Sequence, residues 1–295
     1  MNIDISTVSS NIMLKSAYAS YASRNPSWKY ETIVELYNYI YEKTDPSQHS
    51  LLELEIKFGT FKLLGGYSWL QYVKDIFKLP TVKNEGGNFI NFESKLTENE
   101  FYAILYSIDC ECERNTEIRK FDPELYTETL YSSRKRLSEV TNMRTNEKKV
   151  HIIKKDDKHH VQLRNKGSDM RITICKEFPT DITEQDAPES FRDKFRMSYK
   201  FRFFRIDLTI VQSGKTLQEK NSSSPIFEVE FEFDEINIRA KEFSNFEAFS
   251  KIIERFLDNA FAIYESISPE FYSRFSSIRS NTDSLFGDYI VNVCK

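Results

Sequence analysis

The stretch FEVEFEF, from Phe227 to Phe233, alternates apolar residues with three glutamates, Glu228, Glu230 and Glu232. A period of two residues predicts a β-strand with one apolar face and one carboxylate face. Glutamate is uncommon in strands, and like charges on one face repel each other. The pattern therefore predicts that positively charged groups lie over these three side chains.

A second strand with the same pattern lies near the start of the chain, in LELEIKFG (Leu52–Gly59). Glu53, Glu55 and Lys57 share one face of this strand, and the opposite face is apolar. If the carboxylates of the two strands converge, they offer oxygen ligands for a hard divalent cation, Mg²⁺ or Mn²⁺.

Strands between these two carry the opposite charge. In RDKFRMSYK, Lys194 and Arg196 share one face of the strand. In RIDLT, Arg205 and Asp207 share one face, and in SRKRL, Arg134 and Arg136 do. One such strand alone is usually a solvated face. Together, the strands indicate a closed sheet with a polar interior, in which cations hold an anionic substrate and carboxylates hold a metal. A polyphosphate suits both groups.

The wider pattern predicts an α+β protein. Helical spacing covers Pro26–Thr44, Thr97–Asp109, with a capping box from Thr97 to Glu100, and Phe243–Ile267. From Glu124 to Ile238 the chain is mostly strand-like, including the run FRMSYKFRFFRIDLTIV, with short polar turns such as TNMRTNE, KDDK and NKGSD. Many short strands favour an antiparallel barrel or sandwich.

We expect one domain with three parts: an N-terminal helical segment (1–48), a strand-rich core (49–240) and a C-terminal helical segment (241–295).

Composition limits the classes of function. The net charge of −4 argues against a protein that holds long nucleic acid through many phosphates, so any such contact is expected to be short and local. The N-terminus does not resemble a signal peptide, and no apolar run is long enough for a membrane span. The four cysteines do not have zinc-site spacing, and we expect reduced thiols.

The chain resembles the metal-dependent RNA 5′-triphosphatases of the fungal, protozoan and viral type, which belong to the triphosphate tunnel metalloenzymes. Four motifs carry the resemblance, in this order: LELEIKFG, KFRMSY, RIDLT and FEVEFEF. The resemblance implies an eight-stranded antiparallel β tunnel with flanking helices. It also implies hydrolysis of the γ-phosphate from the 5′-triphosphate end of nascent RNA, which leaves a diphosphate end for mRNA capping.

The resemblance further implies roles for single residues. Glu53, Glu55 and Glu232 would coordinate Mg²⁺ or Mn²⁺, above an acidic floor completed by Glu228 and Glu230. Lys194 and Arg196 would contact the γ-phosphate, Arg205 and Asp207 would support these contacts, and Glu177 would orient the attacking water. Arg136 matches an upstream phosphate-binding arginine, and the roles of Arg134, Lys154 and Lys155 stay open.

Two alternatives remain at this stage. ELEIK also satisfies E-x-E-x-K, the signature of the branch that acts on thiamine triphosphate, inorganic triphosphate or ATP. The second alternative is a non-catalytic module that binds triphosphate ends. Such a module would gain nothing from several glutamates beside the bound triphosphate.

The expected partners follow from the same reading. The chain contains no K-x-D-G motif of a guanylyltransferase, so that enzyme would be another chain or domain, and a homodimer is left open. The expected location is the nucleus for a cellular eukaryotic protein, or the host cytoplasm or virion for a viral one.

Overall fold

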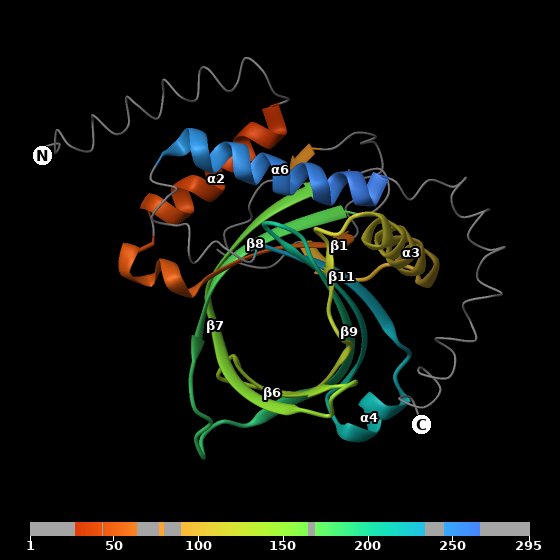
Figure 1. Cartoon of the computed structure of the whole chain (residues 1–295). Helices are drawn as coiled ribbons and strands as arrows, with labels where there is room; N and C mark the ends of the chain where they lie inside the picture. The colour runs from red at the N-terminus through yellow and green to blue at the C-terminus, as the bar shows by residue number, and fades with distance from the viewer. Residues whose placement is uncertain are drawn as a thin grey trace, which may run out of the picture.

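The computed structural model describes residues 27–42, 44–63, 77–79, 90–164, 169–233 and 245–265. Its centre is a closed ring of eight antiparallel strands in the order β10-β11-β1-β8-β7-β6-β5-β9, which the pairing of β9 with β10 closes (Figure 1). The ring strands are β1 (Leu52–Leu63), β5 (Glu124–Tyr131), β6 (Lys135–Asn142), β7 (Lys148–Arg164), β8 (Asp169–Pro179), β9 (Pro188–Lys200), β10 (Arg205–Gly214) and β11 (Ile226–Glu232). The predicted eight-stranded tunnel is thereby confirmed.

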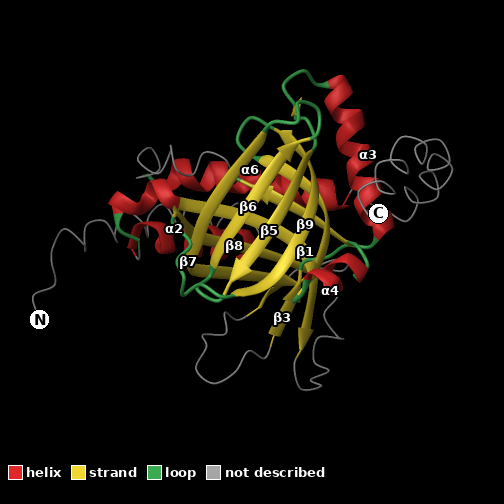
Figure 2. Cartoon of the chain, turned by 90° about the horizontal axis from the view of Figure 1, so that it is seen from below, coloured by secondary structure: helices red, strands yellow, loops and turns green. Residues whose placement is uncertain are grey.

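Short strands and helices surround the ring (Figure 2). β2 (Phe77–Leu79), β3 (Ile90–Glu93) and β4 (Arg119–Lys120) pair with β7, β1 and β9. The helices are α2 (Ser27–Glu42), the 3₁₀ helix η1 (Pro46–Leu51), α3 (Glu98–Arg114), α4 (Leu217–Ser222) and α6 (Phe246–Glu265). No helix in the described part of the chain is long and apolar enough to cross a membrane.

The hydrophobic core lies between the outer wall of the barrel and the helices. Leu54 and Ile56 of β1 and Phe231 of β11 are 0% exposed. Aromatic side chains of α6 continue this layer, because Phe256 lies 5.5 Å from Phe233, measured between ring centroids. The apolar faces of β1 and β11 therefore lie on the outer, helix-covered side of the barrel, which leaves their charged faces for the interior.

Helix α3 begins as the sequence predicts. The Thr97 hydroxyl accepts a hydrogen bond from the Glu100 N–H at 3.3 Å, and the Glu100 carboxylate accepts one from the Thr97 N–H at 2.7 Å. This reciprocal pair satisfies backbone donors that a helix start otherwise leaves open. The predicted capping box is confirmed.

Two predictions within the strand-rich region are wrong. KDDK is not a turn: β7 runs through it, and the register with β8 shifts between Asp156 and His159, so a bulge absorbs one extra residue. The run FRMSYKFRFFRIDLTIV is not continuous, because the chain reverses between β9 and β10, where the Phe201 N–H donates to the Phe204 carbonyl at 2.8 Å.

The turn at TNMRTNE is present between β6 and β7, whereas most of NKGSD lies outside the described residues. The predicted division at 48/49 and 240/241 stays a prediction, and its second boundary also lies outside them.

Candidate active site

The predicted glutamates of β1 and β11 lie side by side on the inner wall of the barrel. The register pairs Glu55 with Glu232 across the two strands. Side chains in such positions have Cβ atoms roughly 5 Å apart. Glu53, Glu228 and Glu230 follow on the same faces by the two-residue period. Strand pairing therefore gathers five carboxylates that the sequence keeps far apart.

Positive groups cover this carboxylate surface. Lys57 lies 2.7 Å from Glu230, and Arg196 of β9 lies 3.6 Å from the other oxygen of that carboxylate. β10 separates β9 from β11, so the contact with Arg196 reaches past a strand through the interior. Arg205 forms a close ion pair with Glu232. The prediction that positively charged groups lie over the glutamates of β11 is confirmed for Glu230 and Glu232.

The ion pairs change the acidities of the inner wall. Burial favours a neutral Glu230, but Lys57 and Arg196 outweigh it and hold the pKa of Glu230 well below its usual range. For Lys57, burial is likewise outweighed by the carboxylates, which raise its pKa. Burial and the charge of Glu230 raise the pKa of Glu228. Glu228 is therefore the floor carboxylate that takes up a proton most easily.

Asp207 organises the basic side chains. It is 1% exposed and accepts hydrogen bonds from Ser198 at 2.7 Å and from Arg205 at 3.0 Å. Its second oxygen lies 3.1 Å from Arg196. The carboxylate thus fixes both guanidinium groups, a positioning task that requires an anion at this point.

Lys194 has a counter-ion that sequence reasoning missed. Its ammonium lies 2.9 Å from Glu128 of β5, and both side chains are nearly fully buried. Arg136 lies 3.8 Å from the same carboxylate. Burial outweighs the attraction of Glu128 and lowers the pKa of Lys194 to about 8. Glu128 stands in ELYTETLY, where threonines on the opposite face hide the alternation.

Glu177 faces the interior between two cations. Its carboxylate lies 2.8 Å from Lys155 and 3.5 Å from Arg136. Lys155 also forms a close ion pair with Glu53, so β7 links the predicted water-orienting residue to a predicted metal ligand. Of the upstream basic residues left open by the sequence, Lys155 is the one that joins the site.

Arg134 and Lys154 lie elsewhere. The expectation that Arg134 shares a face with Arg136 is wrong, because Arg134 occupies the β5–β6 turn with a φ of 63°, and its side chain is 75% exposed. Lys154 pairs with Asp156 at 2.8 Å, on the opposite strand face from Lys155. The turn interrupts the two-residue period on which the expectation rested.

Two further arginines join the inner wall. Arg192 precedes Lys194 by two residues on β9, and Arg171 shares the Glu177 face of β8. Among the described residues, neither has a carboxylate within ion-pair distance, and burial lowers the pKa of Arg171. The two-residue period could have revealed both. They offer positive charge that internal pairs do not neutralise.

The donor set fits a hard divalent cation. Glu53, Glu55 and Glu232 supply only oxygen ligands, and strand pairing sets two of them directly opposite each other. As they lie, no three Asp, Glu, His or Cys side chains in the described residues form a group that could hold an ion. Each of the three carboxylates instead contacts a cation, respectively Lys155, Lys57 and Arg205.

Comparisons with known proteins complete the description. A family model described as mRNA capping enzyme, beta chain, matches residues 26–268. A solved structure of the S. pombe Pct1 RNA triphosphatase has 20% identity, covers 83% of this chain and 95% of its own, and gives a TM-score of 0.66. A structure of the same protein in complex with the Spt5 CTD has 19% identity to this chain, covers 82% of this chain and 95% of its own, and gives a TM-score of 0.64. No curated protein matches significantly. The Pct1 structures show that the two chains share the tunnel fold.

Proposed function

We propose, since this chain belongs to the family of mRNA capping enzyme beta chains, that it is an RNA 5′-triphosphatase. It removes the γ-phosphate from the 5′-triphosphate end of RNA and leaves a diphosphate end for cap formation. The observation that carries the proposal is a closed barrel whose interior combines the paired glutamates of β1 and β11 with cations from β6, β7, β8 and β9.

The proposed cofactor is Mg²⁺ or Mn²⁺, held by Glu53, Glu55 and Glu232, with Glu228 and Glu230 as the floor below. When bound, the ion supplies Lewis-acid stabilisation of charge on the transferring phosphoryl group. Lys155, Lys57 and Arg205 contact these three carboxylates, and Lys155 and Lys57 also hold Glu177 and Glu230. These cations would therefore stay beside the ion and the anionic substrate.

The basic residues hold the triphosphate. Lys194, Arg196 and Arg136 bind the γ-phosphate, and Arg171 and Arg192 add positive charge without an ion pair to any described carboxylate. Phosphoryl transfer passes through a loose transition state, so positioning and charge stabilisation provide most of the catalysis. Asp207 and Arg205 act as positioning residues, because they fix Arg196 and Glu232.

Glu177 is the proposed water-orienting residue. Its carboxylate accepts a hydrogen bond from the attacking water and turns the water oxygen toward phosphorus, opposite the β–γ bridging oxygen. Lys155 and Arg136 hold the carboxylate in place by ion pairs at 2.8 and 3.5 Å. No side-chain nucleophile takes part in this route.

The remaining partners follow from the reaction. We propose that a separate RNA guanylyltransferase uses the diphosphate product. A homodimer, and a location in the nucleus or in a viral setting, stay predictions.

The test is phosphate release with Mg²⁺ from three substrates: triphosphate-ended RNA, thiamine triphosphate and inorganic triphosphate. We expect the highest kcat/KM for RNA and full loss of release in EDTA. A large preference for either small substrate would instead assign the protein to the E-x-E-x-K branch. Tight RNA binding without release at any metal concentration would indicate a binding module.

A further inference from the structure

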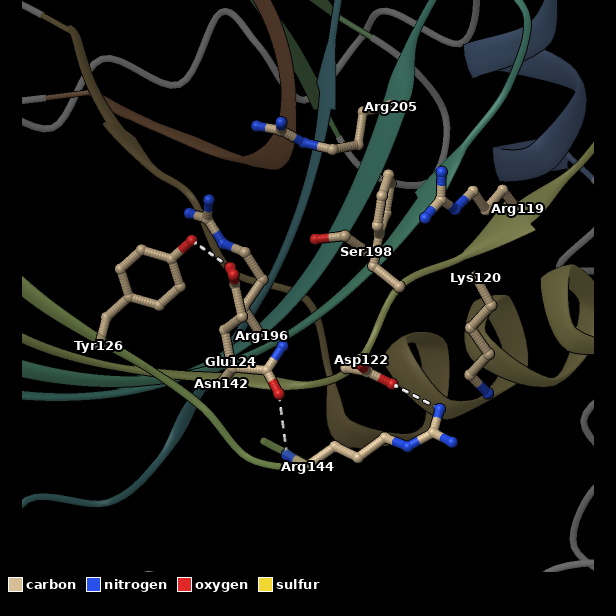
Figure 3. Close-up of a pocket in the computed structure, with 11 residues that line it drawn as sticks. Arg119, Lys120, Asp122, Glu124, Tyr126, Asn142, Arg144, Arg196, Ser198 and Arg205 are labelled. Atoms are coloured by element: carbon tan, nitrogen blue, oxygen red, sulfur yellow. Dashed lines mark hydrogen bonds and ion pairs between the residues drawn. The ribbon is translucent and has the colours of Figure 1, made fainter. Parts of the chain in front are cut away.

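One mouth of the tunnel opens into a basic pocket. The pocket has a volume of about 500 Å³ and lies where β9 ends and β5 and β10 begin (Figure 3). Arg196, Ser198 and Arg205 of the candidate active site form part of its lining. The pocket is therefore continuous with the place where the triphosphate is proposed to bind.

The charge of the pocket differs from that of the whole chain. Five cationic side chains and two carboxylates line it, an excess of three positive charges in a protein of net charge −4. Three of the cations, Arg119, Lys120 and Arg144, stand on the outer rim, away from the paired charges of the interior. A local excess of this kind attracts a polyanion to one end of the tunnel.

The rim arginines are held weakly. The Arg144 side chain is 79% exposed, and its carboxylate partner among the described residues, Asp122, lies at 3.4 Å. Exposed pairs of this kind contribute little stability, so Arg144 can exchange its partner for a phosphate. Arg119 has no carboxylate within ion-pair distance among the described residues, and its guanidinium lies 5.1 Å from the ring centroid of Phe121. Lys120, in contrast, is tied to Asp109 at 2.6 Å.

We infer, resting on the proposed RNA 5′-triphosphatase activity, that this mouth holds the start of the RNA chain directly after the triphosphate. Arg119 and Arg144 contact the phosphodiester backbone there. A cavity of this volume accommodates a ligand of roughly drug size, which corresponds to about one nucleotide. Guanidinium planes and aromatic rings at the mouth also give a base a surface for stacking without sequence preference.

This assignment gives the enzyme a means to prefer RNA over free triphosphates. Inorganic triphosphate reaches only the interior cations, whereas an RNA chain also reaches the rim. The rim contacts therefore act on the RNA substrate alone. The contact is short and local, which agrees with an acidic chain that does not hold long nucleic acid.

The test compares the double variant Arg119→Ala/Arg144→Ala with the double variant Lys251→Ala/Arg255→Ala. Lys251 and Arg255 are exposed cations of α6, outside the tunnel wall, so the control variant also removes two positive charges. Lys251 is paired with Glu247 at 2.8 Å, as Arg144 is with Asp122, so each double variant also breaks one exposed ion pair. kcat/KM is measured with Mg²⁺ for inorganic triphosphate, GTP and triphosphate-ended RNA of five nucleotides, at several salt concentrations. Thermal melting checks that both variants are folded.

For the rim variant we expect kcat/KM on RNA to fall about tenfold, with inorganic triphosphate within twofold of the unmodified protein. The slope of log kcat/KM against log salt should become shallower by about 1.4, since two contacts to a single strand are lost. The control variant should keep the full preference for RNA. An equal loss on all three substrates, or no loss on RNA, would overturn the inference.

A separate measurement distinguishes this inference from the proposed function. The anisotropy of a fluorescent five-nucleotide RNA with a 5′-triphosphate reports binding without turnover. If the unmodified protein hydrolysed no substrate, the proposed function would fail. Weaker RNA binding by the rim variant would then still support the inference that the mouth binds RNA, and equal binding by the rim and control variants would refute it.

Discussion

At the scale of single residues, the barrel interior is a set of ion pairs whose partners often come from strands that are not neighbours. Lys155 of β7 contacts Glu53 of β1, and Arg196 of β9 contacts Glu230 of β11. Buried pairs of this kind do not by themselves add much stability, because desolvation opposes their attraction. Their value lies in holding charged groups at fixed positions for a substrate and a metal.

We expect Glu53→Ala, Glu55→Ala and Glu232→Ala each to abolish metal-dependent phosphate release. Loss of one proposed ligand should remove several kcal/mol of transition-state stabilisation, on the order of 3 kcal/mol or more. Glu147→Ala, which removes a carboxylate that is 62% exposed in the β6–β7 turn, serves as the control. Near-normal turnover in all three variants would mean that the metal, if used, binds elsewhere.

The pKa of Lys194 predicts a pH dependence. Burial lowers this pKa to about 8, so the ammonium is charged below that pH and loses its charge as the pH rises through it. kcat/KM with Mg²⁺ should therefore fall on the alkaline side near pH 8. Lys194→Arg keeps its charge at all these pH values, so any activity that it retains should lack this decline. An identical alkaline decline in the variant would assign it to another group.

At the scale of elements, each strand has two different tasks on its two faces. Phe231 on the outer face of β11 is 0% exposed and packs against Phe58, 5.6 Å away between ring centroids, while Glu230 and Glu232 beside it face the interior. The wall of the tunnel is thus stabilised from outside by helices and aromatic residues. The inner face is free to carry charges that a conventional core would exclude.

Phe231→Ala tests this division of tasks. It should lower the free energy of unfolding by about 3–5 kcal/mol, because it removes a buried aromatic side chain and leaves a cavity. Denaturant unfolding measures the change, and Val150→Ala, at a position that is 62% exposed on β7, is the control. A change below about 1 kcal/mol would contradict the placement of the core outside the barrel.

At the scale of the whole molecule, metal binding and folding should be linked through the acidic floor. Several carboxylates share the inner wall, and a divalent cation that binds only the folded state raises its stability. Glu55→Gln removes one proposed ligand, while its cation Lys57 keeps Glu230 at 2.7 Å. We expect an unchanged or slightly raised melting temperature without metal, and a smaller increase on addition of Mn²⁺.

Glu128→Gln is the matched comparison, because it also removes one interior carboxylate. Glu128 is the counter-ion of buried Lys194, so its loss leaves an unpaired charge and should cost about 3–5 kcal/mol without metal. The increase in its melting temperature on addition of Mn²⁺ should be as large as in the unmodified protein. If the two variants exchanged these signatures in thermal melting, Glu55 would be the structural partner and Glu128 the ligand.

The sequence by itself determined the faces of the strands. The two-residue period of LELEIKFG and FEVEFEF separated carboxylates from apolar residues, and the structure places the apolar side outward under the helices. The same period could have revealed Arg192 and Arg171. Such patterns are readable because the direction of a side chain on a strand is a local property of the backbone. The capping box of α3 is local in the same way, and it too was predictable.

Only the tertiary structure decided which strands meet and in which register. The pairing of Glu55 with Glu232, the choice of Lys155 over Lys154 and the burial of Glu128 against Lys194 all depend on contacts between distant segments. The bulge at KDDK and the turn at Arg134 each interrupt the two-residue period of the strands, and neither has a distinct signal in the amino-acid sequence. The physical reason is that strand register is set by the packing of the closed barrel as a whole, whereas periodicity reports only one strand at a time.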